Sequence, residues 1–390
     1  MGPETAMPPV RKPLSGARGG GWKERAERFA RERILPRAGG WDVEDDMPSE
    51  VVRELARERF LGLTIPPRYG GSGADTWTLA EVLERLAFGS LAVATLVSVH
   101  LSVAAAPIEA RGTPAQKERY LPALAEGSMI GAFGLTEPAA GSDAQHLQAR
   151  YRRKSGGFVL DGTKMFITNG KSAGVVLAFA TRDAGLGGRG ISAFLVAQGT
   201  PGFVPGQRRE KMGLRGSETM ELVFRDCELP LDSLLGEEGQ GFVIAMEALE
   251  GGRIGIAACS LGVAEAALEA LKAGLPSDPE PWQRSVLARS FVDVEAARAL
   301  VEKAARLKDA GEAFSGAASA AKIYASQAAF RVASQALDAV GWEAVDRAGR
   351  HRLERLFRDA RVLSIVEGTT EIQERILGRR LLDPPASGPA

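Results

Sequence analysis

The sequence of 390 residues lacks net charge, because 49 lysine and arginine side chains balance 49 aspartate and glutamate side chains. A chain without net charge exerts no long-range attraction on a phosphate backbone or on an anionic membrane surface. We therefore do not expect nucleic acid as a partner.

Cysteine and histidine are also scarce. The two cysteines, Cys227 and Cys259, cannot form a disulfide framework, and neither has a second thiol or a histidine at metal-ligand spacing. The three histidines, His100, His146 and His351, lie far apart in the sequence. Few histidines are therefore available for a catalytic zinc site or a serine–histidine triad. We expect no metal site, a reduced cytoplasmic protein, and a structural core role for His100, which lies in an apolar run.

The sequence has no apolar segment with the length and purity of a membrane span. The longest, residues 91–108, contains Thr95 and His100 among other polar residues and ends near a proline, which predicts a buried helix. The first 20 residues and the last eight, 383–390, are rich in proline and glycine, and we expect flexible tails there.

The residues that are present indicate a globular α+β protein with several domains, since 45% are hydrophobic and 25% are charged. Residues 21–126 have a helical apolar period. Residues 127–236 contain short runs of Val, Ile, Phe and Thr separated by turn residues, which predicts a β-barrel domain. Residues 237–382 return to long, alanine-rich amphipathic helices, typical of a helical bundle whose surfaces also meet other subunits.

One glycine pattern imitates a nucleotide-binding motif. Gly185, Gly187 and Gly190 match G-x-G-x-x-G, but the following segment, ISAFLVAQ, has the composition of a strand. A dinucleotide site needs a helix there, so that the helix N-terminus faces the pyrophosphate. We therefore interpret these glycines as a hairpin loop.

A second segment, residues 131–143 (GAFGLTEPAAGSD), has more specific features. Phe133 and Leu135 can anchor it in the core, and the turn that follows leaves backbone N–H groups and the hydroxyls of Thr136 and Ser142 free to bind a flat, polar group. An ordinary domain linker is the alternative. Further along, KMFITNG places an aromatic ring beside a hydroxyl, a pair that by itself most often reflects packing.

A third segment, VEGTTEIQ, contains the best candidate for a catalytic group. We expect one helix to end at Gly368 and the next to begin with Thr370 as its N-cap and Gln373 at the capping-box position. Glu367 then lies between the two helices, where the negative end of a helix dipole and apolar neighbours raise the pKa of a carboxyl toward that of a general base. The alternative is an exposed charge at a helix junction.

Taken together, GLTEPAAGSD, KMFITNG, the pair LLGEEGQGF and GGRIGIAA, and RLFRDARVLSIVEGTTEIQ resemble the acyl-CoA dehydrogenase family, over residues 22–382. The resemblance implies an N-terminal helical domain, a middle β-barrel domain and a C-terminal four-helix bundle, with FAD bound between the last two domains of a homotetramer. It also implies a fatty-acid-metabolism activity: α,β-dehydrogenation of an acyl-CoA thioester to the trans-2-enoyl-CoA, with electrons passed to an electron-transferring flavoprotein.

The same resemblance implies roles for individual residues, with Glu367 as the catalytic base of the short- and medium-chain type. The implied FAD-binding residues are Phe133, Leu135, Thr136, Ser142, Phe166, Ile167, Thr168, Thr369, Thr370 and Glu371. The implied substrate-binding residues are Ser142, Glu250, Gly251, Gly252, Arg253 and Gly368.

Two segments depart from the family pattern, and both belong to the part of the FAD site that a neighbouring subunit supplies. LPSDPEPWQRS stands in place of an Arg-x-x-Phe-Gly segment, and residues 338–344 (DAVGWEA) stand in place of a Gln-x-x-Gly-Gly-x-Gly segment. Asp338 would repel a pyrophosphate, and Trp342 would obstruct close approach of the backbone.

Four interpretations therefore stay open. The chain is an active dehydrogenase with a modified site for the adenine end of FAD, or one subunit of a hetero-oligomer whose partner supplies the missing elements. It is otherwise a non-catalytic relative that binds acyl-CoA or protein without flavin, or, with least support, an oxidase or monooxygenase. The sequence leaves the length and branching of the acyl chain open.

Overall fold

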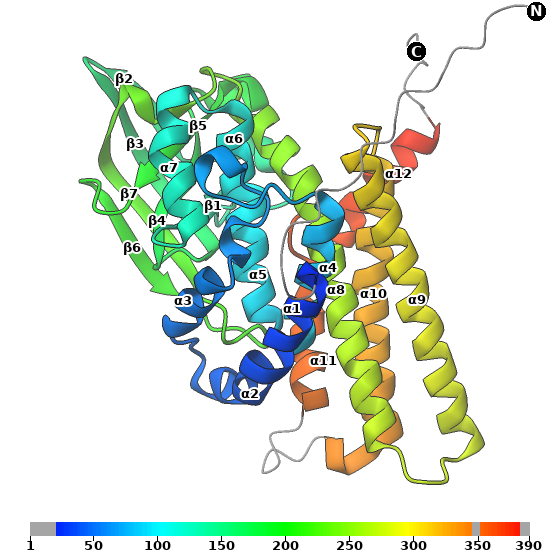
Figure 1. Ribbon diagram of the computed structural model, residues 1–390. Coiled ribbons are helices and arrows are strands. Elements are labelled where there is room, and N and C mark those ends of the chain that lie inside the picture. The colour runs from blue at the N-terminus through cyan, green and yellow to red at the C-terminus, as the bar shows by residue number, and fades with distance from the viewer. Residues whose placement is uncertain (1–20, 345–351, 383–390) are drawn as a thin grey trace, which may run out of the picture.

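The computed structural model describes residues 21–344 and 352–382, so the predicted tails at 1–20 and 383–390 lie outside the described residues. The chain forms a helical region, a sheet region and a second helical region in sequence order. In Figure 1 the N-terminal helices lie between the sheet and the long C-terminal helices. The N-terminal helices are therefore in a position to contact both the sheet region and the C-terminal helices.

The N-terminal region is helical, as its apolar period predicts. Its capping is local: the Asp75 side chain accepts the Thr78 N–H at 2.8 Å, and Thr113 and Gln116 form a capping box at the start of α7. The elements are α1 (Trp22–Phe29), η1 (Ala30–Ile34), α2 (Leu35–Glu44), α3 (Glu50–Arg57), η2 (Phe60–Gly62), η3 (Pro67–Tyr69), α4 (Thr76–Gly89), α5 (Leu91–Ser98), η4 (Val99–Ala105), α6 (Ala106–Arg111) and α7 (Pro114–Glu126).

Two helical stretches are long and apolar enough to cross a bilayer, by length and composition alone. They are Leu91–Arg111 and Gly241–Gly274, and 89% and 78% of their apolar windows are buried inside the protein. The expectation of a buried helix at 91–108 is therefore confirmed. These two stretches form the centre of the core, where α5 and η4 contact α8.

His100 has the structural role expected of it. Its Nδ1 accepts the Gly131 N–H at 3.1 Å, and its Nε2 lies 3.0 Å from the carbonyl oxygen of Leu61 and 3.2 Å from that of Leu124. Burial lowers the pKa of His100 to about 4, so the ring is neutral at pH 7. The histidine ties η4 to the strand that carries residues 131–134.

The middle region is a sheet domain, but the expected β-barrel is wrong, because the sheet is not closed. The strand order is β6-β7-β3-β2-β4-β5-β8, and β1 pairs with β4. Among the described residues no pairing joins the edge strands β6 and β8. The strands are β1 (Ile130–Gly134), β2 (Arg150–Lys154), β3 (Gly157–Thr168), β4 (Ala173–Thr181), β5 (Ile191–Ala197), β6 (Phe203–Arg208), β7 (Thr219–Pro230) and β8 (Leu234–Leu235).

The open sheet still encloses a core because it divides into two halves. Only one residue pair, Arg150 with Thr181, joins β2 to β4, whereas the pairings on either side are extensive. Buried side chains from both halves, such as Phe158 and Phe194 with their rings 5.2 Å apart, form one cluster. A core between two half-sheets gives the same alternating sequence pattern as a barrel.

The glycine pattern at Gly185, Gly187 and Gly190 lies in a loop, as its context predicted. It forms a short helical turn, η6 (Ala184–Gly190), between the antiparallel strands β4 and β5. Gly187 has a φ of 54°, and the Asp183 carboxylate accepts the Gly185 N–H at 2.8 Å. No long helix follows these glycines, so a phosphate site of the dinucleotide-binding type is excluded there.

The described part of the C-terminal region contains three long helices and two shorter ones, and α10 packs against α8, α9, α11 and α12. Alanines on the buried face of α10, including Ala325 and Ala329, allow close approach of the neighbouring helices. The elements are α8 (Gly241–Gly274), α9 (Pro281–Asp309), α10 (Ser315–Val340), η8 (Gly341–Ala344), α11 (Arg352–Leu363) and α12 (Thr370–Leu382), with a short turn η7 (Leu231–Ser233) before β8.

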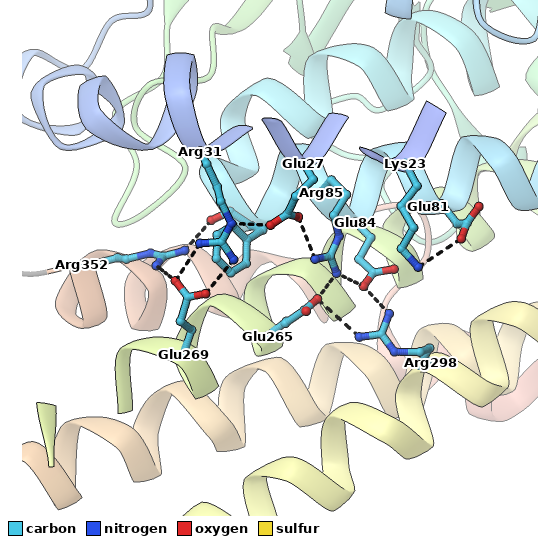
Figure 2. A network of polar contacts seen from close by, with 11 residues as sticks. Lys23, Glu27, Arg31, Glu81, Glu84, Arg85, Glu265, Glu269, Arg298 and Arg352 are labelled. Carbon is cyan, nitrogen blue, oxygen red and sulfur yellow. Dashed lines mark hydrogen bonds and ion pairs between the residues drawn. The ribbon is translucent and has the colours of Figure 1, made fainter. Parts of the chain in front are cut away.

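A partly buried ionic cluster joins the N-terminal helices to the bundle (Figure 2). Arg85 and Glu84 are neighbours on α4, and Arg85 contacts both Glu84 and Glu265, which lies on α8. Arg298 of α9 also contacts Glu84 and lies 3.4 Å from Glu265. We call these four residues the interdomain clamp. Glu84 is 1% exposed, so its charge is stabilised by the two arginines rather than by water.

Candidate active site

Glu367 lies in the turn between α11 and α12, at a junction of helices as predicted, although the boundaries differ. Helix α11 ends at Leu363, before the predicted Gly368, and α12 begins at Thr370, so Thr369 rather than Thr370 is its N-cap. The Thr369 hydroxyl accepts the Ile372 N–H at 3.4 Å. A turn follows the helix over residues 364–367, and the left-handed φ angles of 52° at Glu367 and 93° at Gly368 occur where this turn leads into α12.

The Glu367 carboxylate is buried and has no hydrogen-bond partner among the described residues. Both of its oxygens are inaccessible to solvent and accept no hydrogen bond from any residue that the structure describes. Burial raises the pKa of Glu367 to about 7, and the positive charges of Lys322 and Arg253 oppose that rise. Burial, rather than the helix end, is the main cause. An exposed charge at a helix junction is therefore excluded.

Helix α8 passes directly beside the Glu367 carboxylate. A Cβ atom on Gly252 would lie 2.0 Å from the Glu367 Oε2 and 3.1 Å from Val103. Glycine at this position is what allows the carboxylate to lie against the helix backbone. Gly252, one of the predicted substrate-binding residues of α8, therefore lies directly against the predicted base.

The other α8 residues of this group either carry a charge or lie next to one. Arg253 is 5% exposed, and its Nη1 lies 4.0 Å from the Glu250 Oε1. Glu250 also accepts the Ser315 hydroxyl at 2.6 Å. The Lys308 ammonium lies 2.8 Å from where a Cβ on Gly251 would be. Of these charged groups, Arg253 is the one that acts on the Glu367 carboxylate.

Strand β1 carries the segment 131–143 toward the same site. Phe133 packs edge-on against Phe179, with ring centroids 5.1 Å apart, and also against a small buried cluster of Val99, Val103 and Ala248. Val103 is the residue that also approaches Gly252. Val103 therefore links the cluster that contacts Phe133 to the part of α8 that lies beside Glu367.

The turn after β1 is held by a buried ion pair that the sequence analysis missed. The Glu137 carboxylate accepts the Lys164 ammonium at 2.6 Å and the N–H groups of Gln148 at 2.5 Å and Ala149 at 3.0 Å. Lys164 also donates to the Leu135 carbonyl at 3.3 Å, and burial lowers its pKa to about 8. A lysine facing inward on a strand signals such a partner, because a buried charge needs one.

The KMFITNG segment lies beside this turn, since the Met165 N–H donates to the Thr136 carbonyl at 2.8 Å. The β3–β7 register is irregular between Lys164 and Ile167, and Phe166 there has a φ of 59°. This distortion leaves Phe166 59% exposed while Ile167 is 2% exposed. Strained backbone that presents an aromatic ring outward is a feature of binding sites.

The fit of FAD to this surface can be tested on the groups that are free to bind it. The hydroxyls of Thr136, Ser142 and Thr168 have no hydrogen-bond partner among the described residues, and the Phe166 ring offers an exposed flat face. These residues fit a flat ring with polar edges. The fit is weaker at residues 338–344, where Asp338 is exposed and Trp342 is 79% exposed.

Not all predicted site residues meet. No hydrogen bond or ion pair among the described residues joins Ser142, which is exposed, to the segment Glu250 to Arg253. Beyond the turn, the Thr370 hydroxyl donates to the Ser364 carbonyl at 3.4 Å. Glu371 is exposed, and hydrogen bonds from its own N–H and from Thr369 lower its pKa.

Comparison with known proteins gives a consistent assignment. Sequence models of the N-terminal, middle and C-terminal domains of acyl-CoA dehydrogenase match residues 21–128, 132–227 and 239–382. An acyl-CoA dehydrogenase of Bacillus subtilis (strain 168) is 41% identical over 362 residues, which is 91% of this chain and 95% of that protein.

Two solved structures are similar over nearly the whole chain. Butyryl-CoA dehydrogenase from Megasphaera elsdenii has a TM-score of 0.90 and 39% identity, covering 93% of this chain and 97% of that one. A chain of the structure described as "Electron transferring flavoprotein of Acidaminococcus fermentans: Towards a mechanism of flavin-based electron bifurcation" has a TM-score of 0.90 and 38% identity with the same coverage. With all three domains matched in order, this chain belongs to the acyl-CoA dehydrogenase family.

Proposed function

We propose that this protein is an FAD-dependent acyl-CoA dehydrogenase that converts a short-chain acyl-CoA thioester to the trans-2-enoyl-CoA. The observation that carries the proposal is the buried carboxylate of Glu367, whose two oxygens have no partner within the described residues. Burial of a carboxylate without a hydrogen-bond partner is energetically unfavourable, and such a group is suited to accept a proton from a ligand. The likeness to a butyryl-CoA dehydrogenase supports a short acyl chain.

The chain's own residues account for the proton transfer. With a pKa of about 7, a substantial part of the Glu367 population is ionised at neutral pH and can take the α-proton of the thioester. The Glu367 backbone N–H makes no hydrogen bond to any described residue, so it is free to donate to the thioester carbonyl and stabilise the negative charge that develops there. When bound, FAD supplies the oxidant that accepts the hydride equivalent from the β-carbon.

The residues proposed to hold FAD are those of the β1 turn and the distorted end of β3, namely Phe133, Leu135, Thr136, Ser142, Phe166, Ile167 and Thr168, together with Thr369, Thr370 and Glu371 at the start of α12. The residues proposed to hold the CoA thioester are Ser142, Glu250, Gly251, Gly252, Arg253 and Gly368. The electron acceptor is proposed to be an electron-transferring flavoprotein, and the protein is proposed to be a cytoplasmic homotetramer.

The visible spectrum of the purified protein tests the proposed function. We expect a flavin band, either as purified or after addition of FAD, that bleaches when butyryl-CoA is added without oxygen. The reason is that hydride transfer to the flavin removes its visible absorption. Mass analysis should then identify the trans-2-enoyl-CoA. A flavin band that no acyl-CoA bleaches would contradict the proposal.

Hetero-oligomerisation is a second candidate, favoured by the acidic Asp338 and the exposed Trp342 where the family has a glycine-rich segment. In that case the isolated chain binds FAD only when a second family member is added. The non-catalytic alternative has less support, because it leaves the unpaired, buried Glu367 without a role.

The contact between Gly252 and Glu367 gives a further prediction. In Gly252→Ala the added methyl group would lie 2.0 Å from the Glu367 Oε2, so the carboxylate must move. We expect flavin reduction by butyryl-CoA to slow by roughly tenfold or more, because small displacements of a catalytic group are costly. Gly378→Ala is the matched control, since a Cβ there meets nothing within 4 Å. Equal reduction rates in both variants would show that the position of the carboxylate does not matter.

A further inference from the structure

Lys322 of α10 is a buried cation with no part in the roles assigned so far. Its side chain is completely buried, and its ammonium donates to the Gly368 carbonyl at 2.7 Å. Gly368 directly follows Glu367 in the turn. A lysine is rarely buried without a partner, and here the hydrogen-bond partner is the backbone of the turn itself.

The face of α10 that carries Lys322 holds the turn at two points. One helical turn earlier, the Ser319 hydroxyl donates to the Gln373 Oε1 at 2.9 Å. The Gln373 amide in turn donates to the Glu367 carbonyl at 3.4 Å and to the Gly368 carbonyl at 3.3 Å. Two consecutive left-handed residues are strained and need such anchors.

Lys322 also acts on the carboxylate through its charge. The ionisable groups that face Glu367 are Lys322 from α10 and, from α8, Arg253 and the Cys259 thiol. Burial and the Glu367 charge both raise the pKa of the Cys259 thiol, which is therefore neutral. Glu371 of α12 faces Lys322 rather than Glu367. The carboxylate thus has two positive neighbours and no negative one among the described residues.

The two cations, Arg253 and Lys322, differ in their other contacts. Arg253 is shared with Glu250, and it also faces Arg380 of α12, which repels it. Lys322 has its ammonium on the backbone of the Glu367 turn. Burial lowers the pKa of Lys322 to about 8, and the negative charge of Glu367 is the main effect that opposes this fall. The two groups therefore stabilise each other's charged form.

We propose that Lys322 is a positioning residue for catalysis: it fixes the left-handed turn that aims Glu367 and keeps the carboxylate ionised over the working pH range. This inference rests on the function proposed above. Its two parts are separable, because Ser319 contributes to the turn without adding charge.

The first test is the pH dependence of flavin reduction by butyryl-CoA in Lys322→Met, Lys322→Arg and Ser319→Ala. In Lys322→Met we expect the acid limb of the profile to move up by about one pH unit, because the carboxylate loses a nearby positive charge. Lys322→Arg should restore most of the wild-type midpoint. Ser319→Ala should lower the maximal rate without moving the midpoint, and the exposed Lys303→Met of α9 should change neither.

The second test needs no activity and applies even if the proposed function fails. We would measure the stability gained by Glu367→Gln as a function of pH, in the wild-type and the Lys322→Met backgrounds. A carboxyl whose pKa is higher in the folded state than in the unfolded state destabilises the folded protein as the pH rises. The destabilisation grows from the unfolded pKa, near 4.3, up to the folded pKa, and it is constant above that. The gain from Glu367→Gln should therefore level off near pH 7 in the wild type.

In the Lys322→Met background, the pH at which the stability gain from Glu367→Gln levels off should be higher by about one unit, which is the shift expected for the kinetic midpoint. An unchanged levelling point together with an unchanged kinetic midpoint would overturn the proposal. If no acyl-CoA reduces the wild-type flavin, the proposed function fails, and the stability measurement alone decides the role of Lys322. If Lys322→Met does not fold, Lys322→Arg decides. A kinetic midpoint in Lys322→Arg that is one pH unit away from that of the wild type would also overturn the proposal.

Discussion

Glu367→Gln is expected to keep its flavin and to lose flavin reduction by acyl-CoA, with a rate roughly 10²–10⁴-fold below that of the wild type. The amide has nearly the volume of the carboxyl, so it fits the same buried space beside Gly252 without a clash. It cannot accept the α-proton at any accessible pH. Anaerobic stopped-flow absorbance at the flavin band, with butyryl-CoA in excess, gives the rate directly.

The matched control is Glu374→Gln, at an exposed position on the neighbouring helix α12. It carries the same change of charge outside the site and should reduce its flavin at the wild-type rate. Reduction of Glu367→Gln at that rate as well would remove Glu367 from the mechanism. Loss of flavin from Glu367→Gln, with rapid reduction after FAD is restored, would make the residue structural.

The second large effect is expected from Arg85→Met in the interdomain clamp. Arg85 contacts both Glu84 and Glu265, and all three are inside the junction between the N-terminal helices and the bundle (Figure 2). Removing one member of a buried ionic group leaves charge uncompensated, which typically costs about 3–5 kcal/mol. We expect a loss of that order in the free energy of unfolding at pH 7.5, measured by denaturant titration.

The pH dependence of this loss separates the clamp from simple loss of packing. Burial raises the pKa of Glu84, whereas hydrogen bonding and the arginine charges lower that of Glu265, so the two carboxyls titrate as a coupled pair. Without Arg85 the pair retains a proton to higher pH, because the positive charge that favoured its ionisation is lost. The destabilisation should therefore be smaller at pH 5 than at pH 7.5.

Arg289→Met on the exposed face of α9 is the control, with an expected change within about 0.5 kcal/mol. If the loss in Arg85→Met is small and equal at both pH values, the clamp contributes packing alone. The same result would leave the catalytic account unaffected, because the clamp does not contact Glu367.

The sequence was sufficient for the order of the three regions but not for the shape of the middle one. Helical period and strand composition are local, and they predicted helices, strands and helices correctly. Whether a sheet closes depends on pairing between distant strands, here the edges β6 and β8, and no local pattern reports it. The alternating pattern is the same for an open sheet whose two halves enclose a core.

The candidate site was predictable where a motif ends a regular element. Glu367 was identified from a glycine between two apolar helical patterns, and its burial bears out the expectation of a raised pKa. The helix boundaries around it were wrong because α11 ends at Leu363 and a turn follows it. In this turn Glu367 adopts a left-handed conformation, which is uncommon for a residue with a side chain.

The supporting residues were missed for a different reason. Lys322 and Lys164 read as polar positions on a helix and a strand, and polar side chains usually face solvent. Their burial is set by tertiary partners, the Gly368 carbonyl and the Glu137 carboxylate, which lie 46 and 27 residues away in the sequence. A charged residue at a position whose period is apolar was the available signal.

The central claim, that the Glu367 carboxylate removes the α-proton, is tested most directly by hydrogen exchange. The flavoprotein would be held without oxygen or electron acceptor in deuterium oxide with excess butyryl-CoA, and proton NMR would follow deuterium at the α-carbon. The account predicts steady incorporation by the wild type, because the proton held by Glu367 exchanges with solvent before it returns to the thioester. It predicts none above background in Glu367→Gln, and equal incorporation by the two proteins would contradict it.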